Sequence, residues 1–395
     1  MRRLFFENLF LFLALLLGVF QVLVWHWWVV VVHDEATPTP AALLVVGALL
    51  VAINGFVFPA LRRHRRRPGW LGGVLRLYMN VGISTLLVGT VLALLWLLFL
   101  VPAGLLGVMG GSPELAYGSF RLASIAIVGA VVLLLAWGFT GGQAGARHTQ
   151  VRVEVPGLAA ELAGLRIVQI SDLHIGNHLQ GERLSRWVEE VNATSPDLIV
   201  LTGDLFDFDP AFIEDGARRL GALEARHGVY AILGNHDVYT GAEEVAEGLR
   251  RLAPGLRLLR DEIVKLPLPA PLYLAGSEDP GRDWTARDVR LPSLERLAAA
   301  RSDDGPTLLL VHRPELFGQA AELGFPLVLA GHTHGGQMAL PTPGGRYNLA
   351  RVVTPLTRGL YRQGESTLYV NRGLGVGGPS VRINCSREIA TIALA

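Results

Sequence analysis

The stretch LRIVQISDLH, residues 165–174, sets the pattern that decides the fold of this chain. A short apolar run ends on Asp172, and His174 follows two residues later. Four further apolar runs end in the same way, at Gly203-Asp204, Gly234-Asn235-His236-Asp237, His312 and Gly331-His332-Thr333-His334. Short apolar runs bounded by polar and glycine-rich segments indicate buried strands. We therefore expect five strands that carry polar side chains at their carboxyl ends.

The side chains at these strand ends have the composition of a metal site. The carboxyl ends of strands in an open α/β sheet meet at one edge, where ligands bind. Carboxylate, imidazole and amide groups together suit Mn, Fe or Zn. The single cysteine, Cys385, excludes a disulfide within this sequence and a zinc site built from thiolates. The sequence therefore predicts a binuclear centre of divalent metal ions.

The region from Val151 to Ala395 has the alternation of an α/β domain. Short β-rich runs, including Thr367–Asn371 and Glu388–Leu394, are separated by amphipathic segments in much of this region. The amphipathic segments that we expect to be helices are Glu182–Ala193, Pro210–Arg226 and Gly241–Leu252. We predict two packed sheets flanked by helices in one domain, 151–395, preceded by a glycine-rich linker over residues 141–150.

Residues 1–140 have the pattern of a membrane region. Four apolar stretches occur there, Leu9–Val32, Ala41–Leu61, Leu77–Val101 and Phe120–Phe139. Each is near the length of about 20 residues that spans a bilayer as a helix. A buried, all-helical soluble domain is the alternative, but four such runs in succession fit membrane spans far better. We predict four transmembrane helices.

Basic residues predict the orientation of these spans. Arg2 and Arg3 precede the first span, a run from Arg62 to Arg67 separates the second from the third, and Arg147 follows the fourth. The positive-inside rule then places both termini and the domain in the cytoplasm, with the spans in the inner membrane. The basic run either serves this topology alone or also holds anionic lipid head groups. The formal net charge of +1 gives no reason to expect a nucleic-acid partner.

From the sequence, several polar residues have more than one possible role. His236 either binds a metal or faces the substrate, and Asp237 could set its tautomer. Asp207 either orients an imidazole or caps the following helix. Arg313 either binds a substrate phosphate or pairs with Glu315. His178, which follows the first motif, could also reach the site.

The motifs as a set resemble one family. The series Asp-X-His, Gly-Asp-X-X-Asp, Gly-Asn-His-Asp, His and Gly-His-X-His, in this order, resembles the calcineurin-like metallophosphoesterases. Residues 331–337 and 371–375, with Asn384-Cys385, look like the YaeI/YkuE-type branch. The four spans make the chain similar to transmembrane proteins that carry a metallophosphoesterase domain. The resemblance implies a four-layer α-β-β-α sandwich preceded by four transmembrane helices.

The resemblance also implies roles for individual residues. One metal would be held by Asp172, His174, Asp204 and His334. The other would be held by Asp204, Asn235, His312 and His332, so that Asp204 bridges the two. His236 would be the catalytic histidine that faces the phosphate without binding a metal.

The expected function is hydrolysis of a phosphodiester or pyrophosphate bond by a metal-bridging hydroxide. Because the domain is tethered to a membrane, we expect a lipid or nucleotide-lipid substrate. A phosphatase of soluble nucleotides or phosphoproteins is an alternative. A membrane sensor or binding module for a phosphate ligand is an alternative of another class, and the sequence does not indicate an oligomeric state.

Overall fold

The structure is a computed structural model, and it divides into two compact units, Met1–Gly138 and Phe139–Ala395. It describes residues 2–63, 69–108, 113–281, 290–342, 345 and 347–395. Arg65, Arg66 and Arg67 of the basic run lie outside the described residues.

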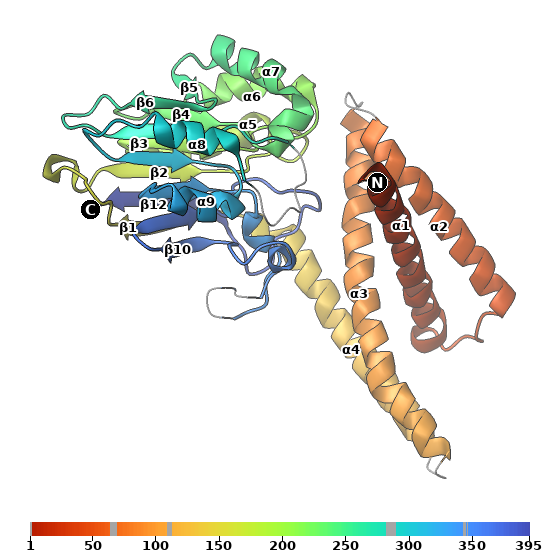
Figure 1. Ribbon diagram of the computed structural model, residues 1–395. Coiled ribbons are helices and arrows are strands. Elements are labelled where there is room, and N and C mark those ends of the chain that lie inside the picture. The colour runs from red at the N-terminus through yellow and green to blue at the C-terminus, as the bar shows by residue number, and fades with distance from the viewer. Residues whose placement is uncertain (1, 64–68, 109–112, 282–289, 343–344, 346) are drawn as a thin grey trace. The chain divides into compact units, whose positions relative to one another are not determined.

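The first unit consists of long apolar helices (Figure 1). These are α1 (Arg2–Trp27), continued by a π-helical turn (Trp28–Val32), α2 (Pro40–Arg63), α3 (Gly69–Val108) and α4 (Pro113–Phe139). Within the described residues, four segments are long and apolar enough to cross a membrane, namely Ala14–Val32, Pro40–Val57, Leu77–Phe99 and Tyr117–Gln143. The prediction of four apolar helices that could each span a membrane is confirmed.

A polar group inside the first unit serves helix packing. Asn54 of α2 is fully buried. Its Nδ2 donates to the carbonyl of Ala14 at 3.2 Å and to Oε1 of Gln21 at 3.0 Å, both on α1. Its Oδ1 accepts a hydrogen bond from the hydroxyl of Tyr78 on α3. An amide satisfied in this way holds three helices together in an apolar surrounding.

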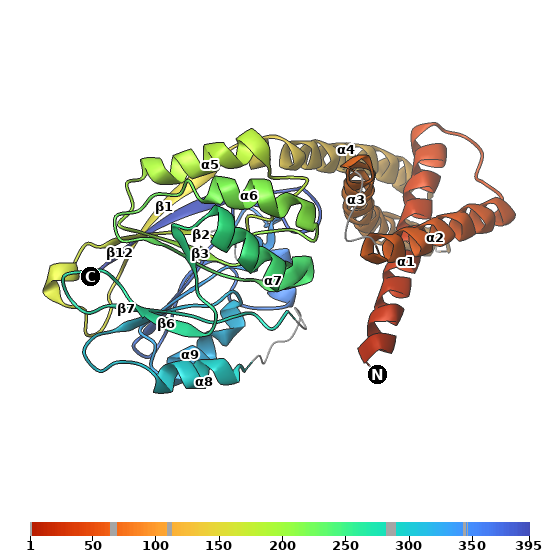
Figure 2. The same cartoon turned by 90° about the horizontal axis from the view of Figure 1, so that it is seen from above.

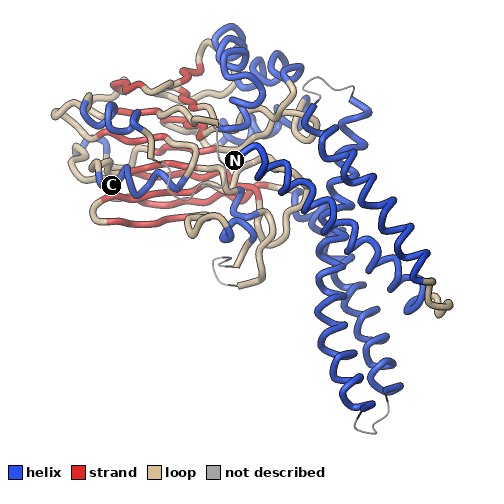
Figure 3. The backbone as a smooth tube through the Cα atoms, turned by 45° about the vertical axis from the view of Figure 1, so that its right-hand side comes forward, coloured by secondary structure: helices blue, strands red, loops and turns tan. Residues whose placement is uncertain are grey.

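The second unit contains two six-stranded sheets, drawn in red in Figure 3. The first sheet has the order β1-β12-β2-β3-β4-β5, with β1 (Ala146–Val153), β2 (Arg166–Ile170), β3 (Leu198–Thr202), β4 (Val229–Ile232), β5 (Leu256–Leu258) and β12 (Arg387–Leu394). The second has the order β10-β11-β9-β8-β7-β6, with β6 (Glu262–Lys265), β7 (Tyr273–Gly276), β8 (Thr307–Leu310), β9 (Leu327–Ala330), β10 (Gly359–Gln363) and β11 (Ser366–Val370). Both sheets are mixed, because parallel and antiparallel pairs occur in each.

Side chains along the central strands point alternately to the two faces of each sheet, and both faces are covered, which gives four layers (Figures 1 and 2). Ile167 and Val200 of the first sheet and Leu310 and Leu329 of the second pack together between the sheets. The opposite face of the first sheet is covered by α5 (Gly181–Ala193), α6 (Ile213–Leu220) and α7 (Asn235–Leu252). The opposite face of the second sheet is covered by α8 (Pro292–Ala299) and α9 (Phe317–Glu322). The predicted α-β-β-α sandwich is confirmed.

Three boundaries differ from those expected, and one of them is the start of α7 at Asn235, six residues before the helix expected over 241–252. Strand β1 begins at Ala146, inside the stretch predicted as a linker, because it pairs in parallel with β12 from Ala146↔Arg387 to Val153↔Leu394. The helix expected over 210–226 ends at Leu220, because the chain turns at Gly221. A Cβ at Gly221 would collide with the carbonyl of Leu252 at the end of α7, so close packing of these helix ends requires glycine here.

The parallel pairs bring the predicted site residues to one edge of each sheet. Strands β2, β3 and β4 are parallel neighbours in the first sheet. Strands β8 and β9 are parallel neighbours in the second. Asp172, Asp204 and Asn235 follow the first three strands, and His312 and His332 follow the other two. The carboxyl ends of the two sheets therefore build the site together.

Candidate metal centre

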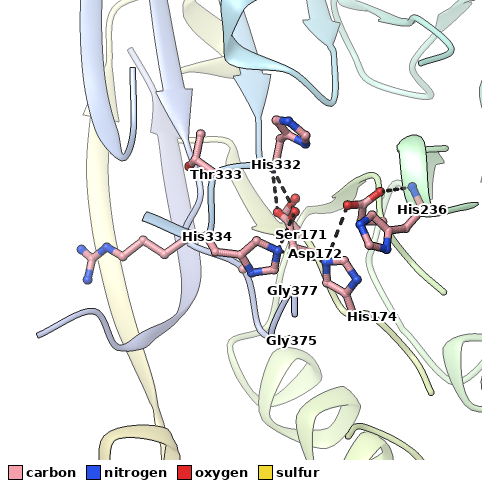
Figure 4. Close-up of polar contacts among 12 residues, drawn as sticks. Ser171, Asp172, His174, His236, His332, Thr333, His334, Gly375 and Gly377 are labelled. Carbon is pink, nitrogen blue, oxygen red and sulfur yellow. Dashed lines mark hydrogen bonds and ion pairs between the residues drawn. The ribbon is translucent and has the colours of Figure 1, made fainter. Parts of the chain in front are cut away.

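The first group of candidate ligands joins the loop after β2 to the loop after β9. Ligand atoms of Asp172, His174 and His334 all lie within 4.8 Å of one another. The Nε2 atoms of His174 and His334 face each other at 2.9 Å, and His334 Nε2 lies 3.5 Å from Asp172 Oδ1 (Figure 4). The backbone N–H of His332 donates to both Asp172 oxygens at 3.0 Å, which fixes the carboxylate in place.

The second group joins the loop after β3 to the loops after β8 and β9. It consists of Asp204, His312 and His332. His312 Nδ1 donates to the carbonyl of Thr202 at 2.8 Å, which leaves its Nε2 at 3.2 Å from Asp204 Oδ2. His332 Nδ1 lies 3.1 Å from His312 Nε2. A ring nitrogen oriented by a backbone carbonyl is the usual arrangement of a metal-binding histidine.

Asn235 supplies the remaining candidate ligand. Its side chain is buried, and its Oδ1 accepts no hydrogen bond from the described residues. A buried amide oxygen without a donor is costly unless something else satisfies it, and a cation does so. The residues of both groups together with Asn235 therefore fit a pair of divalent metal ions.

The charges at the site also fit cations. Burial lowers the pKa of His332 and His334 well below the usual value, so that these rings are neutral and can offer a lone pair. Burial acts in the same direction on His312, but the carboxylates of Asp204 and Asp172 outweigh it and raise its pKa to about 10. The two buried carboxylates thus favour positive charge at this point of the site.

The backbone is strained where it presents these ligands. Asp172, His174, Asp204, His332 and His334 have φ values of 49°, 48°, 53°, 72° and 50°. An L-residue in this left-handed region costs roughly 1–2 kcal/mol. Such strain is retained where the surrounding structure fixes a functional conformation.

Two glycines allow the strand ends to approach the carboxylates. A Cβ at Gly234 would collide with Asp204, and a Cβ at Gly331 would collide with Ser171 and Asp172. Any larger residue at these positions would therefore displace a carboxylate from the site.

His236, at the N-terminus of α7, lies at the rim of the centre. Its side chain is 19% exposed, and its Nδ1 lies 2.9 Å from Asp207 Oδ1. Asp207, and not Asp237, is thus its partner, and Asp209 takes the capping role considered for Asp207. The expectation for Asp237 was wrong, because its carboxylate accepts backbone N–H groups of Leu205, Phe206 and Gly234.

His174, Asp207 and His236 form a third group with metal-binding spacing. In this group Asp207 Oδ1 already accepts from His236 and lies 3.6 Å from His174 Nδ1. Burial lowers the pKa of His236, but Asp204 and the hydrogen bond to Asp207 outweigh it and raise its pKa to about 9. A protonated His236 can donate a proton, as the role predicted for it requires.

Removal of the Asp207 charge is expected to move the alkaline limb of the pH–rate profile. Asp207 raises the pKa of His236, so Asp207→Asn lowers it, and the protonated form is lost at lower pH. The limb should move down by roughly one pH unit. Turnover of a soluble model diester between neutral and alkaline pH measures this. Asp215→Asn, an exposed change on α6, is the control. An unchanged profile in Asp207→Asn would show that turnover does not depend on the protonation of His236.

Arg313 pairs with a carboxylate that the sequence did not indicate. Its Nε donates to Asp279 Oδ2 at 2.6 Å and its Nη2 to Asp279 Oδ1 at 3.0 Å, and both side chains are buried. Asp279 was not among the predicted residues. It stands three residues beyond the end of β7, so it lacks the signal of a polar residue directly after an apolar run.

A cluster of buried carboxylates and imidazoles at the strand ends of a four-layer sandwich defines a metal-binding α/β protein. Residues 165–336 match the calcineurin-like phosphoesterase family. The sequence is 32% identical over 240 residues to the metallophosphoesterase YkuE of Bacillus subtilis, covering 58% of this chain and 79% of that protein. This chain therefore belongs to the calcineurin-like metallophosphoesterase family, as its motifs predicted.

Two further relatives are similar to this chain. A zebrafish (Danio rerio) transmembrane protein with metallophosphoesterase domain is 34% identical over 292 residues, covering 71% of this chain and 64% of that protein. A metallophosphoesterase of Campylobacter jejuni is 33% identical over 246 residues, covering 62% of each. The chain thus spans less than two thirds of the length of these two relatives.

Proposed function

We propose that this protein is a membrane-anchored phosphoesterase that uses two divalent metal ions, Mn, Fe or Zn, to hydrolyse a phosphodiester or pyrophosphate bond. The position of Asp204 carries this proposal. Its Oδ2 lies 3.6 Å from His174 Nε2 in one ligand group and 3.2 Å from His312 Nε2 in the other. One carboxylate within reach of both groups is what a binuclear centre needs.

Different residues of the chain have different roles in the proposed reaction. When bound, two cations supply an activated water and offset charge on the phosphoryl oxygens. Asp172 and Asp204 hold the positive charge in the site. His236 has its Nδ1 engaged by Asp207, so its Nε2 is the atom that donates a proton to the leaving oxygen or stabilises the phosphoryl group.

The surface beside His236 supports a substrate with an apolar or ring-bearing part. Phe208 is 47% exposed, and its ring centroid lies 4.6 Å from that of His236. It stacks on Tyr239 with centroids 5.8 Å apart and an interplanar angle of 9°. An aromatic pair with Phe208 exposed, next to the catalytic histidine, suits a nucleobase or acyl chain. Together with the four candidate spans, this favours a lipid or nucleotide-lipid substrate.

The distribution of charge supports a cytoplasmic catalytic domain. Asp34, between α1 and α2, pairs with Arg121 of α4 at 3.5 Å, so these two ends of the first unit lie on the same side. Arg62 and Arg63 are the last residues of α2, and Arg147 follows α4 in the sequence. Connections rich in arginine face the cytoplasm, which orients the protein in the inner membrane with the second unit inside the cell.

Turnover of a total lipid extract by the metal-loaded, full-length protein in detergent tests the proposal. Mass spectrometry should show a lipid that is consumed and a phosphorylated product that appears, and neither should change with the Asp204→Asn variant. Turnover of soluble diesters or phosphopeptides without any lipid would favour the soluble-substrate alternative. A stoichiometric complex with a phosphoester that is never hydrolysed would favour a sensor or binding module.

A further inference from the structure

A polar cavity lies in the second unit, and the candidate ligands are not part of its lining. It has a volume of about 470 Å³. Its lining includes Phe139 and Gln143 at the start of this unit, Arg183, Arg186 and Trp187 of α5, and Ser380. His178, considered above for the metal site, lines this cavity instead.

The cavity carries an excess of positive charge. Arg183 and Arg186 stand three positions apart on α5, which places them on one face of the helix. Burial, and then repulsion by Arg186, lowers the pKa of Arg183. The acidic residue of the lining, Glu190, is engaged by His148 at 2.7 Å. Among the described residues Arg186 forms no ion pair, so an anion in the cavity would relieve this repulsion.

A buried donor in the same lining also lacks an acceptor. Trp187 is only 8% exposed, and within the described part of the chain its Nε1 donates no hydrogen bond. The guanidinium of Arg387 lies 6.0 Å from the centre of its ring. Burial, and then repulsion by Arg382 and Arg183, lowers the pKa of Arg387 to about 9. Guanidinium and indole N–H groups together form the donor set that a phosphate accepts from.

The chain itself places this cavity next to a membrane span. Phe139 is the last residue of α4, and the candidate span continues to Gln143. Gln143 is fixed on the domain, because Arg387 Nη2 donates to its Oε1 at 2.9 Å and its Nε2 donates to the carbonyl of Ser380. Because the final residues of the candidate span line the cavity, the connectivity of the chain keeps the cavity within a few residues of the end of that span.

One loop separates the cavity from the candidate metal centre. Ser380 lines the cavity, and Gly377, three residues earlier, lies against the ring of His334 (Figure 4). Gln337 holds this loop, because its Nε2 donates to the carbonyl of Gly377 at 3.0 Å and its Oε1 accepts from Gly377 N–H at 2.9 Å. A molecule in the cavity would thus lie beside the metal centre without entering it.

We propose that this cavity binds the anionic, phosphate-bearing headgroup of a membrane lipid at a site distinct from the metal centre. Two guanidinium groups and the indole N–H hold the phosphate, and the acyl chains remain in the bilayer beside the end of the span. The inference goes beyond the proposed hydrolysis, because the bound lipid need not be the substrate.

Native mass spectrometry of the full-length protein in detergent tests this site. The protein is titrated with phosphatidylglycerol and, separately, with zwitterionic phosphatidylcholine. Replacing both arginines, Arg183→Ala with Arg186→Ala, should weaken binding of one phosphatidylglycerol by about 10–100-fold, as expected for the loss of two charge-assisted contacts. Trp187→Phe keeps the packing but removes the N–H, and should weaken it by about 3–10-fold. Phosphatidylcholine binding should not change.

Matched variants separate this site from other effects. Arg250→Ala with Arg251→Ala removes the same charge from α7 and should leave phosphatidylglycerol binding intact. The arginine variant of the cavity should still hydrolyse a soluble diester, and His236→Ala should still bind the lipid, so that this proposal and the proposed hydrolysis can fail separately. Unchanged phosphatidylglycerol binding in the cavity variant would overturn the inference. Tighter binding of inorganic phosphate than of phosphatidylglycerol would also overturn it, because the ligand would then be a soluble anion.

Discussion

Replacing Asp204 by asparagine is expected to abolish hydrolysis and to prevent the binding of two metal ions together. Asp204 is 2% exposed and lies between the two ligand groups, 3.2 Å from His312 Nε2 and 3.6 Å from His174 Nε2. Burial raises its pKa, but His312 and His236 outweigh this and hold the pKa well below the usual value, so the carboxylate is charged. The neutral amide removes the charge that two cations share.

Elemental analysis of the purified Asp204→Asn protein measures this directly, alongside turnover of a model diester. Metal content should fall to one ion or fewer for each chain, and turnover should fall to background. Asp215→Asn, an exposed change on α6, should retain both metals and full turnover. Full activity in the Asp204 variant would mean that this carboxylate does not bridge the two ions.

Replacing His236 by alanine is expected to reduce turnover by about 10²–10⁴-fold while both metal ions remain bound. The ring of His236 is held by Asp207 and partly exposed at the rim, where it can reach a phosphate without entering either of the two predicted ligand groups. Loss of this ring removes a proton donor but no predicted ligand.

The metal content of His236→Ala decides between two arrangements, since His174, Asp207 and His236 also have metal-binding spacing. Loss of an ion in this variant would show that His236 is a ligand. His227→Ala removes a histidine that lies outside these motifs and serves as the control for turnover. A kcat that falls with little change in KM would further indicate a role in the transition state.

The strand ends were the most predictable part of the site. An apolar run followed at once by Asp172, Asp204, His312 or His332 is visible in a single sequence, because burial of a strand on both faces leaves a continuous apolar signal. Because neighbouring strands that carry these residues are parallel, their carboxyl ends lie at the same edge of each sheet, and this explains why the residues lie close together. The left-handed conformation of Asp172 and His334 could not be predicted, since residues other than glycine rarely adopt it and no local pattern marks it here.

Other features depend on packing between segments far apart in the chain. Asp279 stands beyond the end of its strand and pairs with Arg313 across 34 positions, so no local pattern marks the pair. The role of Asp207 as the partner of His236 depends on the loop after β3 reaching the start of α7. The start of β1 at Ala146 depends on pairing with β12. In each case the role or boundary depends on a tertiary contact that the local sequence does not indicate.

The position of β12 between β1 and β2 affects how the protein can be made. The ribosome releases the four membrane helices, then β1 and β2, long before residues 387–394 are synthesised. Until then, β1 has no neighbour in its sheet and β2 has an open edge. The candidate membrane helices are thus complete while the second unit is unfinished, and a premature stop before Arg387 would leave an aggregation-prone fragment.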